Sequence, residues 1–145
     1  MDSTGEHGLI AAPLDQGFDI EWGCPTLVGF GAEGLAIGDG AKNTLDIITA
    51  CSTSGIATDL CDNLDLNGYE DWFLPSKNEL DSLYANKEIV NEKALENNGQ
   101  EFFGGEYWTS SHDLSNTVWN QSFNAGNQIG VLKDSKNYVR AIRAF

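Results

Sequence analysis

The residue types of a hydrolase triad occur side by side in Ser110-Ser111-His112-Asp113. A triad needs a nucleophile, a base and an orienting carboxylate that converge in space, and neighbours on one loop do not reach that geometry by proximity alone. The sequence also has no glycine pattern that opens a helix after a strand and could cradle a phosphate. We therefore expect a protein that is not an enzyme and has no catalytic residue.

One acidic stretch invites a calcium interpretation, because Asn63-x-Asp65-x-Asn67-Gly68 matches the opening of an EF-hand loop. The twelfth position is Leu74, where that loop requires a bidentate Glu, so the motif fails. Asn and Asp side chains also hold turns by bonding their own backbone. We expect no cofactor and no metal, and calcium in a different geometry stays an open alternative.

Three cysteines, Cys24, Cys51 and Cys61, form an odd set without a Cys-x-x-Cys pair, so a standard zinc site is unsupported. Two alternatives remain, namely one disulfide with one free thiol or three buried thiols. Two short helices joined at residues 51–54 would bring Cys51 near Cys61, but a bond depends on geometry that spacing does not supply.

Charge is distributed unevenly, with 22 acidic and 8 basic residues and a net charge of −14. Such a balance disfavours nucleic acid and anionic membranes as partners, and no apolar run is long enough for insertion into a membrane. The last thirteen residues differ, because they hold one acid and four cations: Lys133, Lys136, Arg140 and Arg143. These cations are either solvated charges on a terminal strand or an anion-binding strip.

Polar side chains concentrate in the C-terminal third, on turns between expected strands. The candidate ligand-binding residues there are His112, Asn116, Asn120, Asn124, Asn127 and Asn137. Loops held by a rigid scaffold often carry binding residues, although Asn also occurs simply because it forms turns. Trp119 could stack on a sugar ring, and burial in the core is the favoured interpretation.

The elements that position these residues are organised around residues 66–83. Asn67-Gly68 predicts a turn, residues 72–74 predict a short buried strand, and Ser76 with Glu79 predicts a capping box at the start of a helix. Further helices are expected at 42–51, 54–64 and 89–97, and strands at 8–12, 20–22, 107–111, 118–123, 128–132 and 138–145. Helices followed by a four-strand meander indicate an α+β fold, with short helices on a small twisted antiparallel sheet and long irregular loops.

Several segments of the sequence are characteristic as a set: residues 5–13, 22–24, 35–44, 66–80, 107–111, 118–123 and 139–145. In this order they resemble the Lcl C-terminal-domain family, named after the C-terminal domain of the Legionella collagen-like adhesin, over essentially the whole chain. The resemblance implies one C-type-lectin-like domain over residues 1–145. A strand that usually precedes the Gly5–Gly8 turn is missing, so we expect a domain trimmed ahead of Met1 from a longer chain.

The same resemblance implies a secreted or cell-surface protein without catalytic residues. The named adhesin is trimeric and binds sulfated glycosaminoglycans, so we expect a homotrimeric adhesion domain that binds sulfated or other anionic glycans, weakly and in a salt-sensitive way. The alternative is a protein-receptor-binding domain of the retroelement-diversified type, with variable loops at residues 112–138. A third hypothesis is an enzyme on the related sulfatase-activating scaffold, which needs reactive cysteines.

Overall fold

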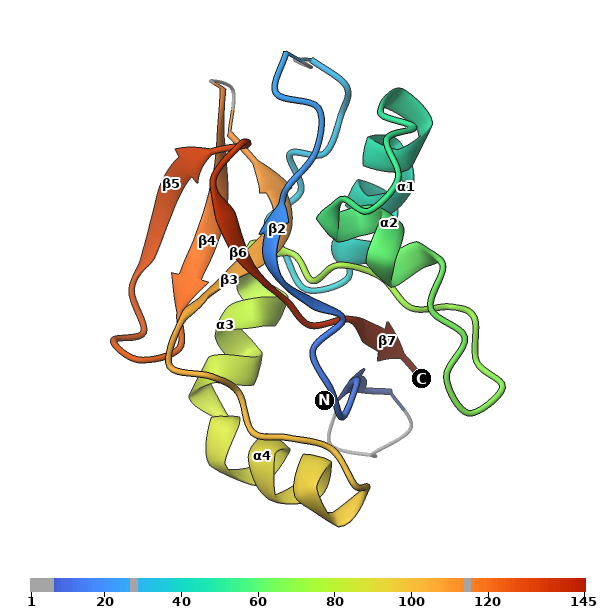
Figure 1. The fold of residues 1–145 in the computed structure, drawn as a ribbon, viewed down its shortest axis with the longest axis vertical. Coiled ribbons are helices and arrows are strands. Elements are labelled where there is room, and N and C mark those ends of the chain that lie inside the picture. Colours follow the sequence, from blue (N-terminus) through green and yellow to red (C-terminus); the bar gives the residue numbers. More distant parts are fainter. Residues whose placement is uncertain (1–6, 27–28, 114–115) are drawn as a thin grey trace.

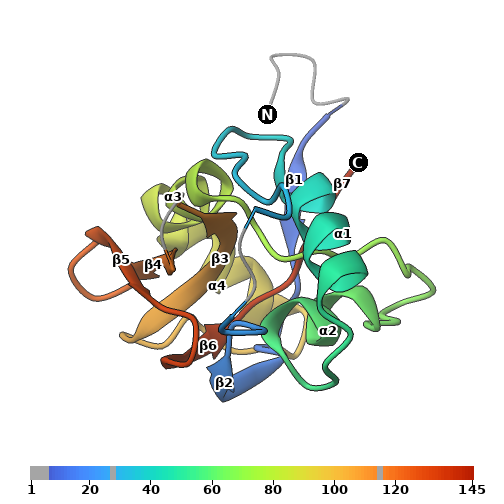
Figure 2. The ribbon, with the colours of Figure 1, turned by 90° about the horizontal axis from the view of Figure 1, so that it is seen from above.

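The computed structural model describes residues 7–26, 29–113 and 116–145. The strands are β1 (Leu9–Ala11), β2 (Gly17–Glu21), β3 (Glu106–His112), β4 (Thr117–Ser122), β5 (Gln128–Leu132), β6 (Lys136–Val139) and β7 (Ile142–Ala144). The helices are α1 (Gly40–Ala50), α2 (Ala57–Asp62), α3 (Lys77–Ala85) and α4 (Lys87–Glu96). This is the predicted α+β class, with helices placed around the main sheet (Figures 1 and 2).

The main sheet has five strands in the order β2-β6-β3-β4-β5, and β1 pairs with β7 in a separate two-stranded sheet. The predicted antiparallel meander is confirmed for β3, β4 and β5. It is wrong for the fourth strand, because β6 returns between β2 and β3 and runs parallel to β3, where Tyr107 pairs with Tyr138. The expected strand 138–145 is divided between β6 and β7, because Arg140 and Ala141 lie between them and are buried in the interior.

Two hydrophobic clusters lie on opposite sides of β3, because successive side chains of a strand point to opposite faces. Trp108 joins one cluster with Trp22, Ile47 and Cys61, and this cluster contains residues of α1 and α2. Tyr107 joins the other cluster, which includes Leu80 and Leu83 of α3 and Phe102, Phe123 and Ile142. The sheet therefore separates the α1–α2 layer from the α3–α4 layer (Figure 2).

The local predictions around α3 are confirmed. The Ser76 Oγ accepts a hydrogen bond from the Glu79 N–H at 3.3 Å, and the Glu79 carboxylate accepts one from the Ser76 N–H at 2.7 Å, which completes the capping box. Asn67 and Gly68 both have positive φ, at 57° and 77°, in the tight turn between Leu66 and Tyr69. The expected strand at residues 72–74 makes only an isolated bridge, from Phe73 to Ile142.

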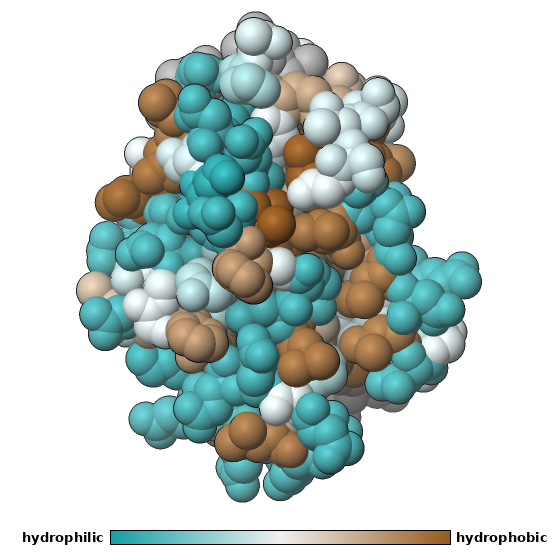
Figure 3. All heavy atoms as spheres, viewed as in Figure 1, coloured by the Kyte–Doolittle hydropathy of each residue, from teal (hydrophilic) through white to brown (hydrophobic). Residues whose placement is uncertain are grey.

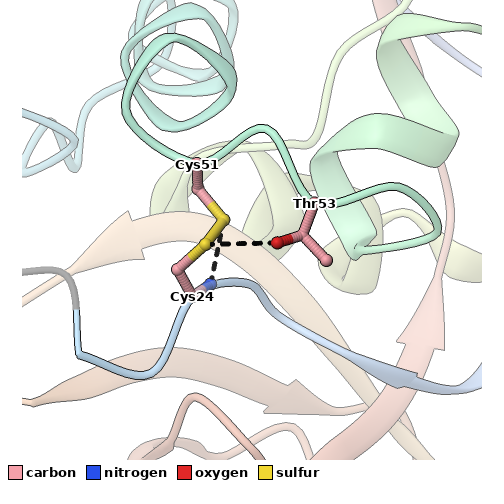
Figure 4. The surroundings of a disulfide bond; sticks show 3 residues. All are labelled: Cys24, Cys51 and Thr53. Atoms are coloured by element: carbon pink, nitrogen blue, oxygen red, sulfur yellow. Dashed lines mark hydrogen bonds between the residues drawn. A yellow bond between two sulfur atoms is a disulfide. The ribbon is translucent and has the colours of Figure 1, made fainter.

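Cys24 and Cys51 form a disulfide bond that ties the segment after β2 to the C-terminal end of α1 (Figure 4). The Thr53 hydroxyl lies 3.4 Å from Cys24 Sγ in the same corner. Cys61 is a free, fully buried thiol in α2, whose pKa is raised chiefly by burial. Of the two sequence alternatives, one disulfide with one free thiol is therefore confirmed.

Candidate functional site

The four C-terminal cations do not form one exposed strip. Lys133 is completely buried, with its Nζ 5.4 Å from the ring centroid of Trp22 and 5.1 Å from that of Phe30. Burial lowers the pKa of Lys133, since desolvation penalises the charged form. Its side chain is part of the packing on one side of the sheet and is not presented to solvent.

Arg140 is also buried, and its guanidinium is occupied within the protein. Its Nε lies 2.5 Å from Oδ1 of Asp15, and one terminal nitrogen donates to the Ala12 carbonyl at 3.0 Å. Tyr107 and Gln100 donate to the other Asp15 oxygen, each at 3.0 Å. The sequence interpretation of Arg140 as a solvent-facing anion binder is thus corrected, because its charge is desolvated and neutralised in the core.

Arg143 and Lys136 remain nearer the surface, and both have an acidic neighbour. Arg143 makes a two-pronged contact with Asp71, at 2.7 and 2.8 Å, and its hydrogen bond lowers the pKa of that carboxyl. Lys136 lies 3.6 Å from Asp19 with its side chain half exposed. Of the four cations, Lys136 has the most exposed side chain, and ligand binding by any of them stays a prediction.

The polar loop residues also divide into buried and exposed groups. His112, Asn120 and Asn137 are buried, whereas Asn116, Asn124 and Asn127 are exposed. The expectation that all six residues are displayed on turns is therefore corrected, because strand pairing turns half of them inward. Trp119, which we expected to be buried or to stack on a sugar, is partly buried and has the Lys77 ammonium 3.4 Å from its ring centroid.

A different set of residues converges where β2, β6 and the start of β3 meet, and we call it the β2–β6 shelf. It is a shallow hollow of about 200 Å³ lined by Phe18, Asp19, Glu106, Lys136, Asn137 and Tyr138, and it is extended by Phe103, whose ring stacks on Tyr138. β2 and β6 lie side by side in the middle of the face seen in Figure 1. Figure 3 shows hydrophobic residues reaching the surface of this face among hydrophilic ones.

The shelf contains two of the residues that the sequence nominated, Lys136 and Asn137. Its other members were not predicted, although Phe18 and Phe103 stand beside Asp19 and Gly104 in segments that are otherwise suited to the surface. That signal is weak in a sequence, because single apolar residues on a surface are common.

The sequence profile of the Lcl C-terminal domain matches residues 16–143. The chain belongs to the Lcl C-terminal domain family. Comparison with curated proteins gives no match. The Lcl C-terminal domain match begins just before β2 and ends within β7, so it includes the shelf, the disulfide and every candidate binding residue. Membership makes this protein an adhesin-related domain.

The serine–histidine motif serves the scaffold of this Lcl C-terminal domain. The Ser111 hydroxyl donates to the Gly34 carbonyl at 2.6 Å, and the Asn43 amide lies 3.3 Å from the Ser110 hydroxyl. The His112 ring stacks on Phe30 with 4.6 Å between centroids, and neither ring nitrogen has a hydrogen-bond partner among the described residues. These groups have packing roles, and their arrangement supplies no nucleophile–base pair.

Within the described ranges, no group of three or more His, Cys, Asp or Glu side chains is placed to hold a metal ion. The residues of the failed EF-hand motif instead shape the chain locally, since the Asn63 amide donates to Asp59 at 2.8 Å. No helix in the part of the chain that the structure describes is long and apolar enough to cross a membrane. Residues 1–6, which include Gly5 and Glu6 of the expected Gly5–Gly8 turn, lie outside the described residues.

Proposed function

We propose that this Lcl C-terminal domain is a non-catalytic adhesion domain that binds glycans non-covalently, at the bacterial surface or outside the cell. The family match over residues 16–143 carries the proposal. The Cys24–Cys51 disulfide supports the location, because such bonds persist mainly in oxidising compartments. Sulfated glycosaminoglycans are the first ligand class to test, because the family resemblance points to them.

The structure limits how a sulfated chain would be held. Lys133 and Arg140 are buried, so a polyanion would meet Lys136 and the outer edge of Arg143. Each of these two has an acidic partner, and the whole chain carries a net charge of −14. Binding at one site is therefore expected to be weak and salt-sensitive, and a homotrimer, which is part of this proposal, would raise the affinity through avidity.

The absence of catalysis is likewise proposed, with support from the placement of the reactive side chains. Cys24 and Cys51 are joined in a disulfide, and the pKa of the buried Cys61 thiol is raised, so the thiolate nucleophile is scarce. An enzyme of the sulfatase-activating type would need a reactive cysteine. The cysteines of this chain favour the binding hypothesis.

The proposal is tested by retention on immobilised heparin at increasing salt, together with light scattering to measure the oligomeric state. Lys136→Ala should reduce retention at low salt. Lys42→Ala is a matched control, because Lys42 is another exposed lysine paired with an aspartate, Asp46, but lies in α1. Equal retention of both variants would remove Lys136 from the site, and no retention of the wild type at low salt would overturn the sulfated-glycan proposal.

A second candidate function, binding of a protein receptor, is favoured by β5. This strand is at an end of the five-stranded sheet, and its Ile129 and Leu132 side chains are exposed. An extended segment of a receptor could pair with that edge while the loops between residues 112 and 138 contact its side chains. Ile129→Asn with Leu132→Asn, which adds no charge, should then abolish salt-resistant binding to host cells and leave heparin retention unchanged.

A further inference from the structure

We propose that the β2–β6 shelf binds an uncharged pyranose residue of a glycan. This inference rests on the proposed role of the domain in glycan attachment, and it names the place on the surface and the chemical class of the ring. It differs from the sulfated-chain expectation, because the recognition comes from aromatic rings and hydrogen bonds and not from cations.

Two phenylalanine side chains supply an apolar surface at the shelf. Phe18 is 73% exposed and Phe103 is 59% exposed. The carbon-bound hydrogens on one face of a pyranose pack well against such rings, since aromatic groups offer a large and rigid apolar area. A hollow that combines exposed aromatic rings with a few polar groups has the composition expected of a small-ligand site.

Stacked tyrosine rings beneath Phe103 fix the position of the aromatic surface. The Phe103 ring stacks on Tyr138 with 5.5 Å between centroids and 10° between planes, and Tyr138 stacks on Tyr107 at 5.2 Å. Gly105 makes room for this arrangement, because a Cβ at that position would lie 2.6 Å from the Tyr138 ring. The Tyr107 hydroxyl also accepts a hydrogen bond from the Phe103 N–H at 2.9 Å. A ligand would thus meet a preformed surface and pay little ordering entropy.

The polar side of the shelf is shaped by a bulge in β2. The register against β6 shifts between Gly17 and Ile20, and Asp19 has a φ of 60° inside the strand. A non-glycine residue in the left-handed region within a strand is uncommon, and bulges of this kind redirect a side chain at functional sites. Here the Asp19 carboxylate comes within 3.6 Å of the Lys136 ammonium.

This carboxylate and ammonium suit two neighbouring sugar hydroxyls, because a hydroxyl can donate to Asp19 and accept from Lys136. Asn137 also borders the hollow, but its side chain belongs to the opposite face of β6 from Lys136 and Tyr138, because successive side chains of a strand alternate. Its Nδ2 is enclosed within the protein and is not offered to a ligand in the hollow.

The charges at the shelf disfavour a sulfated ring seated in the hollow itself, so the sulfated chain of the main proposal would contact Lys136 from outside the hollow. Asp19 and Glu106 place two carboxylates beside the single cation Lys136. A sulfate group would therefore face a net negative site on a protein whose total charge is −14. Lys136 in turn disfavours a cationic ligand, and an uncharged ring with several hydroxyls remains the best match.

The test measures binding of the whole chain, by calorimetry, to the methyl glycosides of glucose, galactose, mannose and N-acetylglucosamine, with heparin in parallel. At least one neutral glycoside should bind, with little dependence on salt. Phe103→Ala should weaken that binding about tenfold, because the stacking surface is lost. Leu95→Ala is the control, since Leu95 is similarly exposed, at 53%, but lies in α4.

Asp19→Asn is a second variant that separates folding from binding, because Asn tolerates the left-handed conformation and removes only the charged acceptor. It should melt like the wild type and still bind the glycoside more weakly. Unchanged binding by both Phe103→Ala and Asp19→Asn would overturn the shelf proposal. If heparin binds and no neutral glycoside does, the shelf proposal is overturned and the proposed adhesion function stands. If neither ligand binds, both proposals are overturned.

Discussion

The Nε of Arg140 lies 2.5 Å from Oδ1 of Asp15, although 125 residues separate the two in the chain. The Arg140 side chain is fully buried and that of Asp15 nearly so. The pair joins the turn between β1 and β2 to the point where β6 gives way to β7. Removing one partner of a buried ion pair strongly destabilises a protein, because the remaining buried charge has neither water nor its partner.

Arg140→Ala should therefore lower the free energy of unfolding by about 3–5 kcal/mol, as measured by urea denaturation. Arg143→Ala is the natural control, because Arg143 also pairs with an aspartate, Asp71, whose side chain is largely exposed. Solvent screens that second pair, so its loss should be much smaller. Similar losses in the two variants would contradict the assignment of Arg140 to the core.

Replacing Cys24 and Cys51 by Ser should lower the free energy of unfolding by about 3 kcal/mol, because the cross-link restricts the unfolded chain. The same urea experiment, with and without a reducing agent, checks this prediction in the wild type.

Cys61 should resist alkylation in the native protein and react after denaturation, because it is buried and its thiol pKa is raised. Rapid labelling of Cys61 under native conditions would instead revive the enzyme hypothesis.

His112 should make the protein less stable at mildly acidic pH. Its pKa is lowered chiefly by burial, and the nearby Lys133 charge adds to the shift. A histidine with a depressed pKa contributes its full stability above its ordinary value near 6.5, and this contribution is lost as the pH falls through the lower, folded-state pKa.

His112→Phe keeps an aromatic ring against Phe30 and removes the titration. The melting temperature of the wild type should fall more between pH 7 and pH 5 than that of the variant. Glu79 acts in the opposite sense, since burial raises its pKa and protonation in acid favours the folded state, so only the difference between the two proteins reports on His112. Parallel pH profiles would rule out His112 as the source.

Glu79→Ala should destabilise the protein by about 2 kcal/mol, because it leaves two backbone donors without their acceptor. Those donors are the Ser76 N–H at 2.7 Å and the Gly38 N–H at 2.8 Å. Glu79→Gln retains an acceptor oxygen and should lose less, which urea denaturation can resolve. Equal losses would show that the charge of Glu79, and not its hydrogen bonding, holds α3 to the loop at Gly38.

Features that depend on near neighbours could be predicted from the sequence. The capping box of Ser76 and Glu79 and the turn at Asn67-Gly68 each depend on contacts within a few residues, and both are present. The three-strand meander follows from strands separated by short polar turns.

The candidate site could not be predicted in the same way, because it depends on contacts between distant segments. In the sequence, Arg140 and Lys136 are both cations of the same C-terminal segment. Only the folded structure shows that Arg140 is buried against Asp15 whereas Lys136 is half exposed. The shelf exists because β6 lies between β2 and β3, which brings Phe18, Glu106 and Tyr138 around one hollow. No local pattern specifies that crossing.

The pairing of β1 with β7 has a mechanical consequence. Gly8 and Phe145 exchange two backbone hydrogen bonds, each of 3.1 Å, at the outer end of this two-stranded sheet. Suppose that the chain is pulled at Gly8 while a ligand holds the shelf. The tension would then pass along β1, the turn at Asp15 and β2. The hydrogen bonds to β7 and the Asp15–Arg140 ion pair would share that load, because both connect the segment ahead of β2 to the C-terminal strands.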